Sequence, residues 1–478
     1  MKTPLHILFA ALLMMSGVAD AQVYNILHNF GSQDRDGTAP EGDLILNSNI
    51  LYGTTVSSST NYNGMFFKIN TDGSGYKVLY SWTNGFVPEG GMVLISNTLY
   101  GTMFTGGAAA NGSIFKINTD GSGFAQLHSF APTVPSGFGT NYDGNRPQRG
   151  VITDGIWLYG TARYGGANGN GTVFKIGTDG SGFAVIKTFP ATYLGTNNVS
   201  GNLVVTSGTN SDGAYPIGSL VFDGSTLYGT TYKGGTSNGV VFAMQTDGGG
   251  FNVLKYFPSI NGIGTNSDGA APVAGLTLSG DTLFGVAVGG GSGAAGNIFK
   301  LKTNGAAFTV LHDLSYNDGM WPPNTLFLDG GTLYGTTAAG GISNKGTIFM
   351  LLTNGGNFTV LRNFDNNTGS QCNSKFVVSS NILYGTANSG GANGGGVVFG
   401  IKILPQIFND RNFGIQANAF SFNFTGISNQ TAIVEFSTNL AQPSWLPLQT
   451  NLLKGAPEFF SDPQSGQYPN GFYRIRSP

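Results

Sequence analysis

An all-β repeat fold is predicted by three features of the sequence. The phrase Leu-Tyr-Gly-Thr, or a close variant, occurs seven times, with Tyr or Phe at positions 52, 100, 159, 228, 284, 334 and 384. Successive copies are 48, 59, 69, 56, 50 and 50 residues apart, a period that indicates repeat units able to bury their apolar faces only against one another. Glycine contributes 77 of 478 residues and aromatic residues 12%, which is typical of a turn-dense β protein with large packing side chains.

Each repeat is predicted to contain four short strands. In the first repeat, runs rich in Ile, Leu, Phe and Tyr lie at 42–46, 50–54, 64–69 and 76–82, bounded by Gly, Asn and Asp. Runs of this length and composition indicate strands. No window after the first twenty residues shows helical periodicity.

The third and fourth strands are joined by the phrase Thr-Asp-Gly-Ser-Gly, at 71–75, 119–123 and 178–182, with a variant at 246–250. Asp-Gly tolerates the positive φ angles of hairpin turns. A calcium loop is the alternative, but calcium prefers several oxygen ligands and each copy holds one carboxylate. A simple turn is therefore favoured.

The two ends of the repeat array complement each other. The seventh repeat stops after its third strand, at 397–403, whereas 23–30 matches the fourth-strand pattern of 124–130 and 358–364 but precedes the first repeat. An N-terminal strand that completes the last sheet would close a ring and remove exposed sheet edges. The sequence thus predicts a seven-bladed β-propeller closed by the N-terminal strand. A β-solenoid, suggested by the Gly-Gly-Ala-Asn-Gly tracts, does not explain the spare strand.

The first 21 residues have the layout of a secretory signal peptide. Lys2 precedes an apolar stretch at 5–15, and Ala19-Asp20-Ala21 offers a cleavage site before Gln22. The apolar stretch is too short to be preferred as a membrane span, and no later segment is long enough. We therefore expect cleavage after Ala21, a secreted or cell-surface location, and a monomer without a transmembrane segment in the mature chain.

Charge and chemistry-bearing residues are sparse. With 22 Lys and Arg against 24 Asp and Glu, the net charge of −2 argues against nucleic acid or an anionic membrane as partner. The single cysteine, Cys372, cannot form an internal disulfide, and we interpret it as an unreactive loop residue. No zinc-protease, Ser/His/Asp, phosphate-loop or dinucleotide motif is present. The sequence therefore predicts no catalytic residues and no metal ligands.

Three histidines share one position in the fourth strand. His28, His128 and His312 stand where the other repeats have Tyr, Lys or Arg. The corresponding residues are Tyr80, Lys187, Lys255 and Arg362. A position that accepts all four residue types is interpreted as a solvated face of an outer strand, not as a metal or acid/base site.

Long loops precede repeats three, four and five. They span 131–149, 190–217 and 258–272, and each contains the phrase Gly-Thr-Asn-x-Asp-Gly. Long loops on a rigid scaffold commonly carry binding residues. The candidate ligand-binding residues are Asn141, Tyr142, Asp143, Arg146, Tyr193, Asn210, Asp212, Tyr215, Asn266 and Asp268.

Three interpretations of these loops remain open. The Asn and Asp side chains could simply bond to their own backbone and order the loops. Alternatively, the loops form a contact surface for a glycan or another polymer, with Tyr142, Tyr193 and Tyr215 as stacking platforms. In the third interpretation, calcium binds to Asp34 and Asp36 or to the Asn-x-Asp-Gly phrases.

The repeat itself resembles a known family. The pattern L-Y-G-T-T-x-x-G-G-x-x-x-x-G-x-V-F-K-I-x-T-D-G-S-G-F-x-V-L-x-x-F, clearest at 158–189 and 227–257, is similar to the GloVer tandem repeats of exported bacterial proteins. The resemblance covers 23–403 and implies export, but it brings no catalytic residues to transfer. The fifth repeat departs from the pattern at Phe284 and Val286.

The repeat ends at Leu404-Pro405, and 404–478 has a different character. Alternating runs at 420–424, 432–436, 445–448 and 472–475 predict a small β-sandwich. The phrases Ser-Thr-Asn-Leu at 437–440 and Phe-Tyr-Arg-Ile at 472–475, with Trp445 between them, resemble a C-terminal module of exported proteins from the same bacterial lineages. This module would anchor or sort the protein, or merely cap the repeats.

The sequence as a whole favours an exported, non-catalytic binding or surface-interaction protein, with a glycan as the candidate ligand and the long loops as its contact surface. One alternative is a polysaccharide hydrolase or lyase using Asp143, Asp212 and Asp268, with Arg146 holding an anionic sugar. Such an enzyme needs two carboxylates, or a carboxylate and a histidine, in one cleft. The other alternative is a purely structural cell-surface protein.

Overall fold

The computed structural model describes residues 22–32, 36–57, 63–83, 85–136, 139–192, 196–199, 202–205, 209–417, 419–468 and 470–478. Across these residues the chain is almost entirely β, and its one helix is the short 3-10 turn η1 (Ser465–Gln467). No helix in this part of the chain is long and apolar enough to cross a bilayer. The predicted signal peptide lies outside the described residues.

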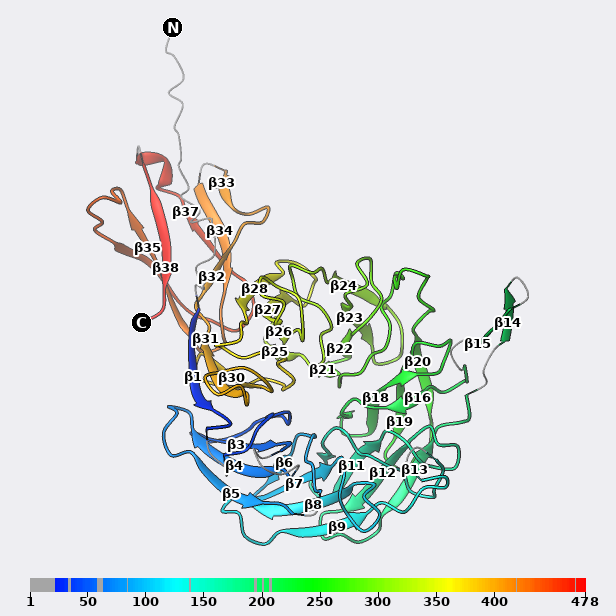
Figure 1. The fold of residues 1–478 in the computed structure, drawn as a ribbon. Coiled ribbons are helices and arrows are strands. Elements are labelled where there is room, and N and C mark those ends of the chain that lie inside the picture. Colours follow the sequence, from blue (N-terminus) through cyan, green and yellow to red (C-terminus); the bar gives the residue numbers. More distant parts are fainter. Residues whose placement is uncertain are drawn as a thin grey trace.

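Each repeat forms one antiparallel sheet, and in most repeats the strands neighbour one another in chain order. Figure 1 shows these sheets following one another around the repeat region. We number these repeat sheets 1 to 7. Sheets 1 to 3 comprise β2 (Ile45–Asn47), β3 (Ile50–Thr55), β4 (Met65–Asn70) and β5 (Lys77–Ser81); β6 (Val93–Ile95), β7 (Thr98–Met103), β8 (Ser113–Asn118) and β9 (Ala125–Ser129); and β10 (Ile152–Thr153), β11 (Trp157–Ala162), β12 (Thr172–Gly177) and β13 (Ala184–Thr188).

Sheets 4 to 7 follow the same plan, with an extra short strand in sheet 4. They comprise β16 (Ala214–Pro216), β17 (Val221–Phe222), β18 (Thr226–Lys233), β19 (Val240–Gln245) and β20 (Asn252–Tyr256); β21 (Thr277–Ser279), β22 (Thr282–Ala287), β23 (Asn297–Lys302) and β24 (Thr309–Asp313); β25 (Phe327–Asp329), β26 (Thr332–Thr336), β27 (Thr347–Leu352) and β28 (Thr359–Asn363); and β29 (Val377–Ser379), β30 (Ile382–Ala387) and β31 (Val397–Lys402), completed by β1 (Val23–Asn29).

The N-terminal strand completes the last sheet, as the sequence predicted. β1 pairs antiparallel with β31, so that Val23 lies opposite Lys402 and Asn29 lies opposite Val397. The two strands run side by side in Figure 1 although they come from opposite ends of the repeat region. Sheet 7 is thereby assembled from both ends of that region.

Hydrophobic clusters join each sheet to the next one in the chain, and one further cluster joins sheet 7 to sheet 1. In that cluster, Phe30 and Tyr384 of sheet 7 pack against Leu44, Leu51 and Phe67 of sheet 1. The other clusters repeat this composition between sheets 1 and 2, 2 and 3, and so on to sheets 6 and 7. Every repeat sheet therefore buries both of its faces.

The Leu-Tyr-Gly-Thr motif follows from this packing. Successive side chains of a strand point to opposite faces, so Leu51 and Gly53 face sheet 7 while Tyr52 faces sheet 2. Gly53 lies directly opposite Phe67 on β4, and a Cβ at Gly53 would come within 2.5 Å of that ring. Glycine is needed there because the ring occupies the place of its side chain.

Residues 404–478 form two antiparallel sheets that share one hydrophobic core. Strand β34, which is rich in Phe, and strand β35 contribute most of that core. The first sheet contains β32 (Gln406–Phe408), β33 (Gly414–Gln416), β34 (Ala419–Thr425) and β37 (Glu458–Asp462), and the second contains β35 (Thr431–Ser437), β36 (Leu446–Leu452) and β38 (Phe472–Arg476). The sequence did not predict β32, β33 and β37.

This C-terminal region packs against sheets 6 and 7. Phe408 and Ile427 enter the cluster between those sheets, and the backbone N–H of Ser428 donates to Asp329 Oδ2 at 2.6 Å. In sheets 3 and 4 the aspartate of the equivalent turn instead accepts a bond from the motif tyrosine: Tyr159 donates to Asp154 and Tyr228 to Asp223. Asp329 thus accepts its hydrogen bond from the C-terminal region, whereas the equivalent aspartates of sheets 3 and 4 accept theirs from their own repeat.

Deleting residues 22–31 should strongly destabilise the repeat region. The deletion removes the pairing partner of β31 and the fully buried Phe30, whose truncation to alanine alone typically costs about 3–5 kcal/mol. The midpoint of urea unfolding should fall accordingly, and a synthetic peptide of residues 22–31 added in excess should partly restore it. An unchanged midpoint would show that β1 is not part of the cooperative fold.

Candidate functional site

The loops at one end of the repeat sheets are tied to one another by backbone hydrogen bonds. In each case the loop entering a first strand meets the loop between the second and third strands of the preceding sheet. The bonds are Ala39 N to Gly395 O (2.8 Å), Gly64 N to Phe86 O (3.0 Å), Arg146 N to Asn111 O (2.8 Å), Tyr215 N to Asn170 O (2.8 Å), Ala271 N to Asn238 O (2.8 Å), Trp321 N to Ala295 O (2.9 Å) and Gln371 N to Lys345 O (3.4 Å). We call this end the loop face.

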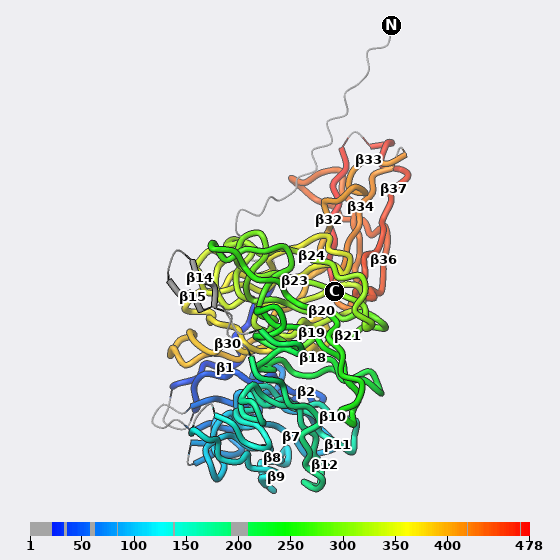
Figure 2. Tube along the Cα trace, turned by 90° about the vertical axis from the view of Figure 1, so that its right-hand side faces the viewer, coloured from blue at the N-terminus to red at the C-terminus, as the bar shows by residue number. Residues whose placement is uncertain are grey.

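The loop before sheet 4 contains a hairpin that the sequence did not predict. Its strands are β14 (Thr196–Val199) and β15 (Asn202–Val205), which pair antiparallel. The loop leads into sheet 4, whose strands β18, β19 and β20 lie in Figure 2 below the C-terminal strands β32 to β34. Tyr193, one of the candidate binding residues, lies outside the described residues.

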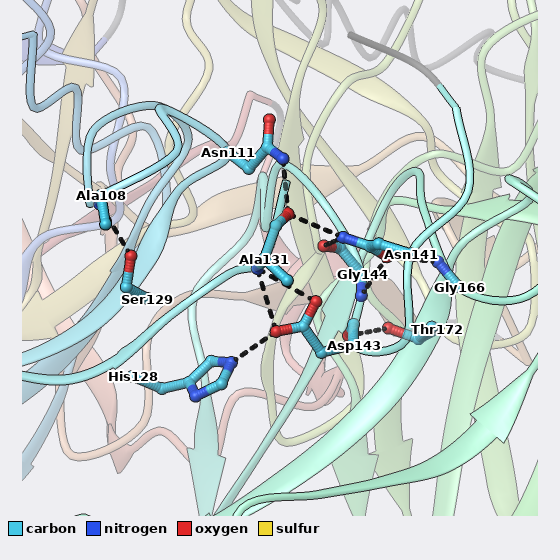
Figure 3. A network of polar contacts seen from close by, with 10 residues as sticks. All are labelled: Ala108, Asn111, His128, Ser129, Ala131, Asn141, Asp143, Gly144, Gly166 and Thr172. Atoms are coloured by element: carbon cyan, nitrogen blue, oxygen red, sulfur yellow. Dashed lines mark hydrogen bonds and ion pairs between the residues drawn. The ribbon is translucent and has the colours of Figure 1, made fainter. Parts of the chain in front are cut away.

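The candidate asparagines order the long loops. The Asn141 side chain donates to the carbonyls of Ala131 (2.9 Å) and Gly144 (2.7 Å) and accepts from the N–H groups of Gly144 and Gly166, as Figure 3 shows. Asn210 and Asn266 make the equivalent bonds in the next two loops. All four hydrogen-bonding positions of these amides are therefore used within the loops.

Each candidate aspartate binds a side chain on the fourth strand of the sheet that precedes its loop. Asp143 is fully buried; its carboxylate accepts from the Ala131 N–H at 3.0 Å and contacts His128 Nε2 at 3.0 Å. Asp212 pairs with Lys187, and Asp268 pairs with Lys255. Each carboxylate is held by a different sheet, and the structure does not bring the three together.

The shared fourth-strand position is not a solvated face, contrary to the sequence-based interpretation. Its side chain lies on an aromatic ring of the following sheet. The contacts are His28 on Tyr76 (3.6 Å), His128 on Phe183 (3.6 Å), His312 on Phe358 (3.9 Å), Tyr80 on Phe124 (5.0 Å), Lys187 on Phe251 (3.8 Å), Lys255 on Phe308 (4.0 Å) and Arg362 on Tyr24 (4.7 Å). Ring and cation stacking suits His, Tyr, Lys and Arg alike. We call these contacts the rim clamps.

The remaining candidate residues lie on the loop face with fewer internal contacts. Tyr142 is 78% exposed. Tyr215 packs edge-to-face against Tyr164 with ring centroids 5.4 Å apart, and the Arg146 guanidinium lies 5.1 Å from the Phe104 ring. Of the candidate residues that the structure describes, Tyr142 is therefore the one most available to a partner.

The loop face also holds a polar cluster that was not among the sequence-based candidates. Arg149 Nη2 donates to the Pro323 carbonyl of the loop before sheet 6 at 3.0 Å, and Arg163 Nη1 donates to Gln148 Oε1 at 3.0 Å. Burial, reinforced by the Glu41 carboxylate, raises the pKa of Glu89 to about 7. The signal was present in the repeat: Pro-Glu at 40–41 and 88–89 and Pro-Gln at 147–148 occupy equivalent positions.

A cavity of about 700 Å³ lies where the first strands of the repeat sheets meet. Its lining is mostly apolar, with Leu44, Val151 and Phe376 among the contributors, and its charged residues are Asp43 and Lys375. The Lys375 N–H donates to Asp43 Oδ1 at 2.7 Å, which joins sheet 7 to sheet 1. The cavity thus offers little polar chemistry of its own.

Exposed apolar side chains gather on the loop face. In the described part of the repeat region, most of the large hydrophobic side chains that are exposed belong to its loops. These residues are Val134, Tyr142, Ile260, Ile263, Tyr316, Trp321 and Ile342. These side chains are therefore the apolar part of the loop face that is open to a partner.

Within the described residues the geometry does not support metal or thiol chemistry, and Asp34, one of the aspartates considered for calcium, lies outside them. The described residues contain no group of three His, Cys, Asp or Glu side chains that could hold a metal ion. In the Thr-Asp-Gly-Ser-Gly turn, Asp72 Oδ1 accepts from the N–H of Ser74 at 2.8 Å and from its hydroxyl at 2.7 Å, so the carboxylate orders the turn. Cys372 is fully buried, and burial raises the pKa of its thiol to about 12.

These features define an all-β repeat protein with a propeller-like arrangement of four-stranded sheets. The model of the Gloeobacter/Verrucomicrobia repeat matches residues 16–210 and 239–440, and the chain belongs to this family, as the sequence pattern had indicated. The second matched segment extends beyond the repeats into the C-terminal region. No functionally curated protein matches the chain.

Solved structures with a related shape are distant. The GH74 xyloglucanase of Xanthomonas campestris is 13% identical, with 89% of this chain and 59% of that chain covered and a TM-score of 0.48. An oligogalacturonate lyase of Vibrio parahaemolyticus is 11% identical, with coverages of 80% and 97% and a TM-score of 0.45. A putative 6-phosphogluconolactonase of Bacteroides uniformis is 15% identical, with coverages of 83% and 95% and a TM-score of 0.41. Similarities this low carry no inference about function.

Replacing Asp143 should affect stability, whereas replacing its neighbour Tyr142 should not. Asp143→Ala leaves the buried Ala131 N–H without its partner, which should lower the free energy of unfolding by about 2–4 kcal/mol. Tyr142→Ala removes an exposed side chain and should change it by less than about 0.5 kcal/mol. Chemical denaturation of the two variants measures the contrast; equal losses would mean that the Asp143 contacts do not order the loop.

Glu89 should make the protein less stable at higher pH. Its pKa in the folded state, about 7, lies above the ordinary value of 4.5, so its contribution is fully present below 4.5 and is lost as the pH rises through 7. The loss is at most about 3 kcal/mol. Glu89→Gln should therefore unfold at a higher temperature than the unmodified protein at pH 8, and at nearly the same temperature at pH 4.5. A difference independent of pH would contradict the shifted pKa.

Proposed function

We propose that the chain is an exported, non-catalytic binding protein that recognises an extracellular polymer, with a glycan as the favoured ligand, through the loop face. In this proposal residues 22–403 form a seven-bladed β-propeller closed by β1, and 404–478 form a small β-sandwich. The inter-sheet clusters, which include one between sheets 7 and 1, support the propeller. The shared core of the two C-terminal sheets supports the sandwich.

The observation that carries the proposed function is the placement of exposed apolar side chains. Tyr142, Tyr316 and Trp321 are each at least half exposed and all belong to the loop face. Aromatic side chains present a large, rigid and amphipathic surface at low entropic cost, which suits both protein and sugar recognition. Asparagines and aspartates of the same loops hold the backbone that carries these rings.

A polysaccharide hydrolase or lyase remains the second candidate because of one observation, the raised pKa of Glu89 beside Glu41. Acid/base glycosidases use two carboxyl groups, one of which is kept protonated by its surroundings so that it can act as the acid. The aspartates first considered for this role, Asp143, Asp212 and Asp268, are each engaged by a separate sheet. A catalytic protein would therefore use the glutamates instead.

The proposed export depends on the signal-peptide pattern of residues 1–21. The proposed sandwich would anchor the protein to the cell, sort it during export, or cap the repeat region. A chain ending at Ile403 should still fold, with some loss of stability because Phe408 and Ile427 leave the cluster between sheets 6 and 7. If the sandwich anchors the protein, the shortened chain should appear in the medium and the full chain in the cell fraction. Equal partitioning would leave only the capping role.

A glycan-array screen of residues 22–478 tests the proposed function, with a reducing-end assay on each bound glycan. Tyr142→Ala should weaken binding at unchanged stability, and no sugar should be released. Asp212→Asn serves as the control for a residue engaged within the fold, since its effect should follow stability alone. Release of reducing ends that Glu89→Gln abolishes would establish the enzyme instead.

A further inference from the structure

Trp321 is the tryptophan that the fold leaves in solvent. It is 51% exposed, whereas Trp82 is buried and Trp157 and Trp445 are half-buried. Its backbone lies in the left-handed region, with φ = 57°. This conformation is uncommon for a bulky residue, but the backbone adopts it at the equivalent position of six of the seven repeats.

The other repeats show that the fold does not require an indole at this position. The equivalent residue in sheet 1 is Ala39, with φ = 55°, and in sheet 5 it is Ala271, with φ = 56°. Both alanines make the same inter-sheet backbone hydrogen bond as Trp321. The Trp321 side chain is thus an addition to a loop conformation that alanine satisfies.

A pocket of about 330 Å³ opens beside Trp321, between the loops of sheets 6 and 7. Its other polar lining residues are Asn344, Lys345, Ser370, Gln371 and Asn373. Asn344 orders its own loop by accepting from the Gly340 N–H at 2.8 Å. In contrast, the side chains of Lys345, Gln371 and Asn373 make no hydrogen bond or ion pair within the described chain.

An exposed aromatic face beside unpaired carboxamides matches the chemistry of a sugar ring. The C–H groups on one face of a pyranose pack against an indole, while its hydroxyls exchange hydrogen bonds with amides at the ring edge. The pocket volume lies at the small end of ligand sites, roughly 300–1,000 Å³. Lys345 is half-buried and has no acidic partner among the described residues, which additionally favours a carboxylate on the ligand.

We propose that this pocket is a carbohydrate subsite, in which Trp321 stacks on a pyranose ring, Gln371 and Asn373 bind its hydroxyls, and Lys345 selects a uronic-acid unit over a neutral one. The proposal rests on the proposed function, because it assigns a ligand class and a position to the same loop face. The proposed subsite lies between the loops of sheets 6 and 7, whereas the long loops first considered for binding precede sheets 3, 4 and 5.

Trp321→Ala tests the subsite without disturbing the fold, since it installs the residue that sheets 1 and 5 already carry. Binding of the full chain to hexagalacturonate and to cellohexaose is measured by calorimetry. Trp321→Ala should weaken hexagalacturonate binding about tenfold or more, at an unchanged unfolding temperature. Lys345→Gln should remove the preference for hexagalacturonate over cellohexaose and leave cellohexaose binding unaltered.

The outcomes separate this proposal from the proposed function. If Trp321→Ala binds as tightly as the unmodified chain while Tyr142→Ala loses binding to an arrayed glycan, the subsite is wrong and the loop face remains the binding surface. If the unmodified chain binds neither hexasaccharide nor any arrayed glycan, both proposals fail. Equal loss of both hexasaccharides in Lys345→Gln would overturn the selection of uronic acid.

Discussion

The repeat region depends on one packing relation, in which the motif glycine of each sheet makes room for a phenylalanine ring of the neighbouring strand. A Cβ on the motif glycine would lie 2.4 to 2.9 Å from that ring in all seven sheets. The space left by glycine brings Phe67 and its equivalents close to the sheet surface, where a neighbouring sheet can pack on them. Tyr52 and its equivalents fill the opposite face. The motif therefore reflects how the sheets pack, and its repetition predicts the architecture but indicates no chemical activity.

The rim clamps add a second layer of contacts at the periphery. The same side chain contacts an aromatic ring of the next sheet and, in five sheets, a carboxylate of the following loop, as His128 does with Phe183 and Asp143. Each clamp therefore couples the position of a loop to the spacing between two sheets. The backbone of the loop face is consequently ordered, and it presents exposed side chains such as Tyr142 and Trp321.

The fold could be predicted because its sequence signals are repeated. The candidate site could not be predicted, since residues such as Trp321 occur in only one repeat. Strand order and the pairing of β1 with β31 followed from period and from a surplus strand. The position shared by His28 and Lys187 was misinterpreted, since residue variety looks the same whether a side chain is solvated or stacked on a ring. Trp321 gave no signal, and the repeated Pro-Glu phrase that contains Glu89 did not reveal that this carboxyl is buried, because exposure and burial depend on contacts that sequence spacing does not encode.

The pairing of the N-terminal strand with the last sheet can be tested most directly by a cross-link. Val23 lies opposite Lys402 and is half exposed, and the native Cys372 is buried, so Val23→Cys with Lys402→Cys places two accessible thiols on neighbouring strands. Mild oxidation should yield an intramolecular disulfide, seen as a faster band on a non-reducing gel, that raises the unfolding temperature; neither single variant should show it. Failure to cross-link, or cross-linking only between molecules, would contradict ring closure by β1.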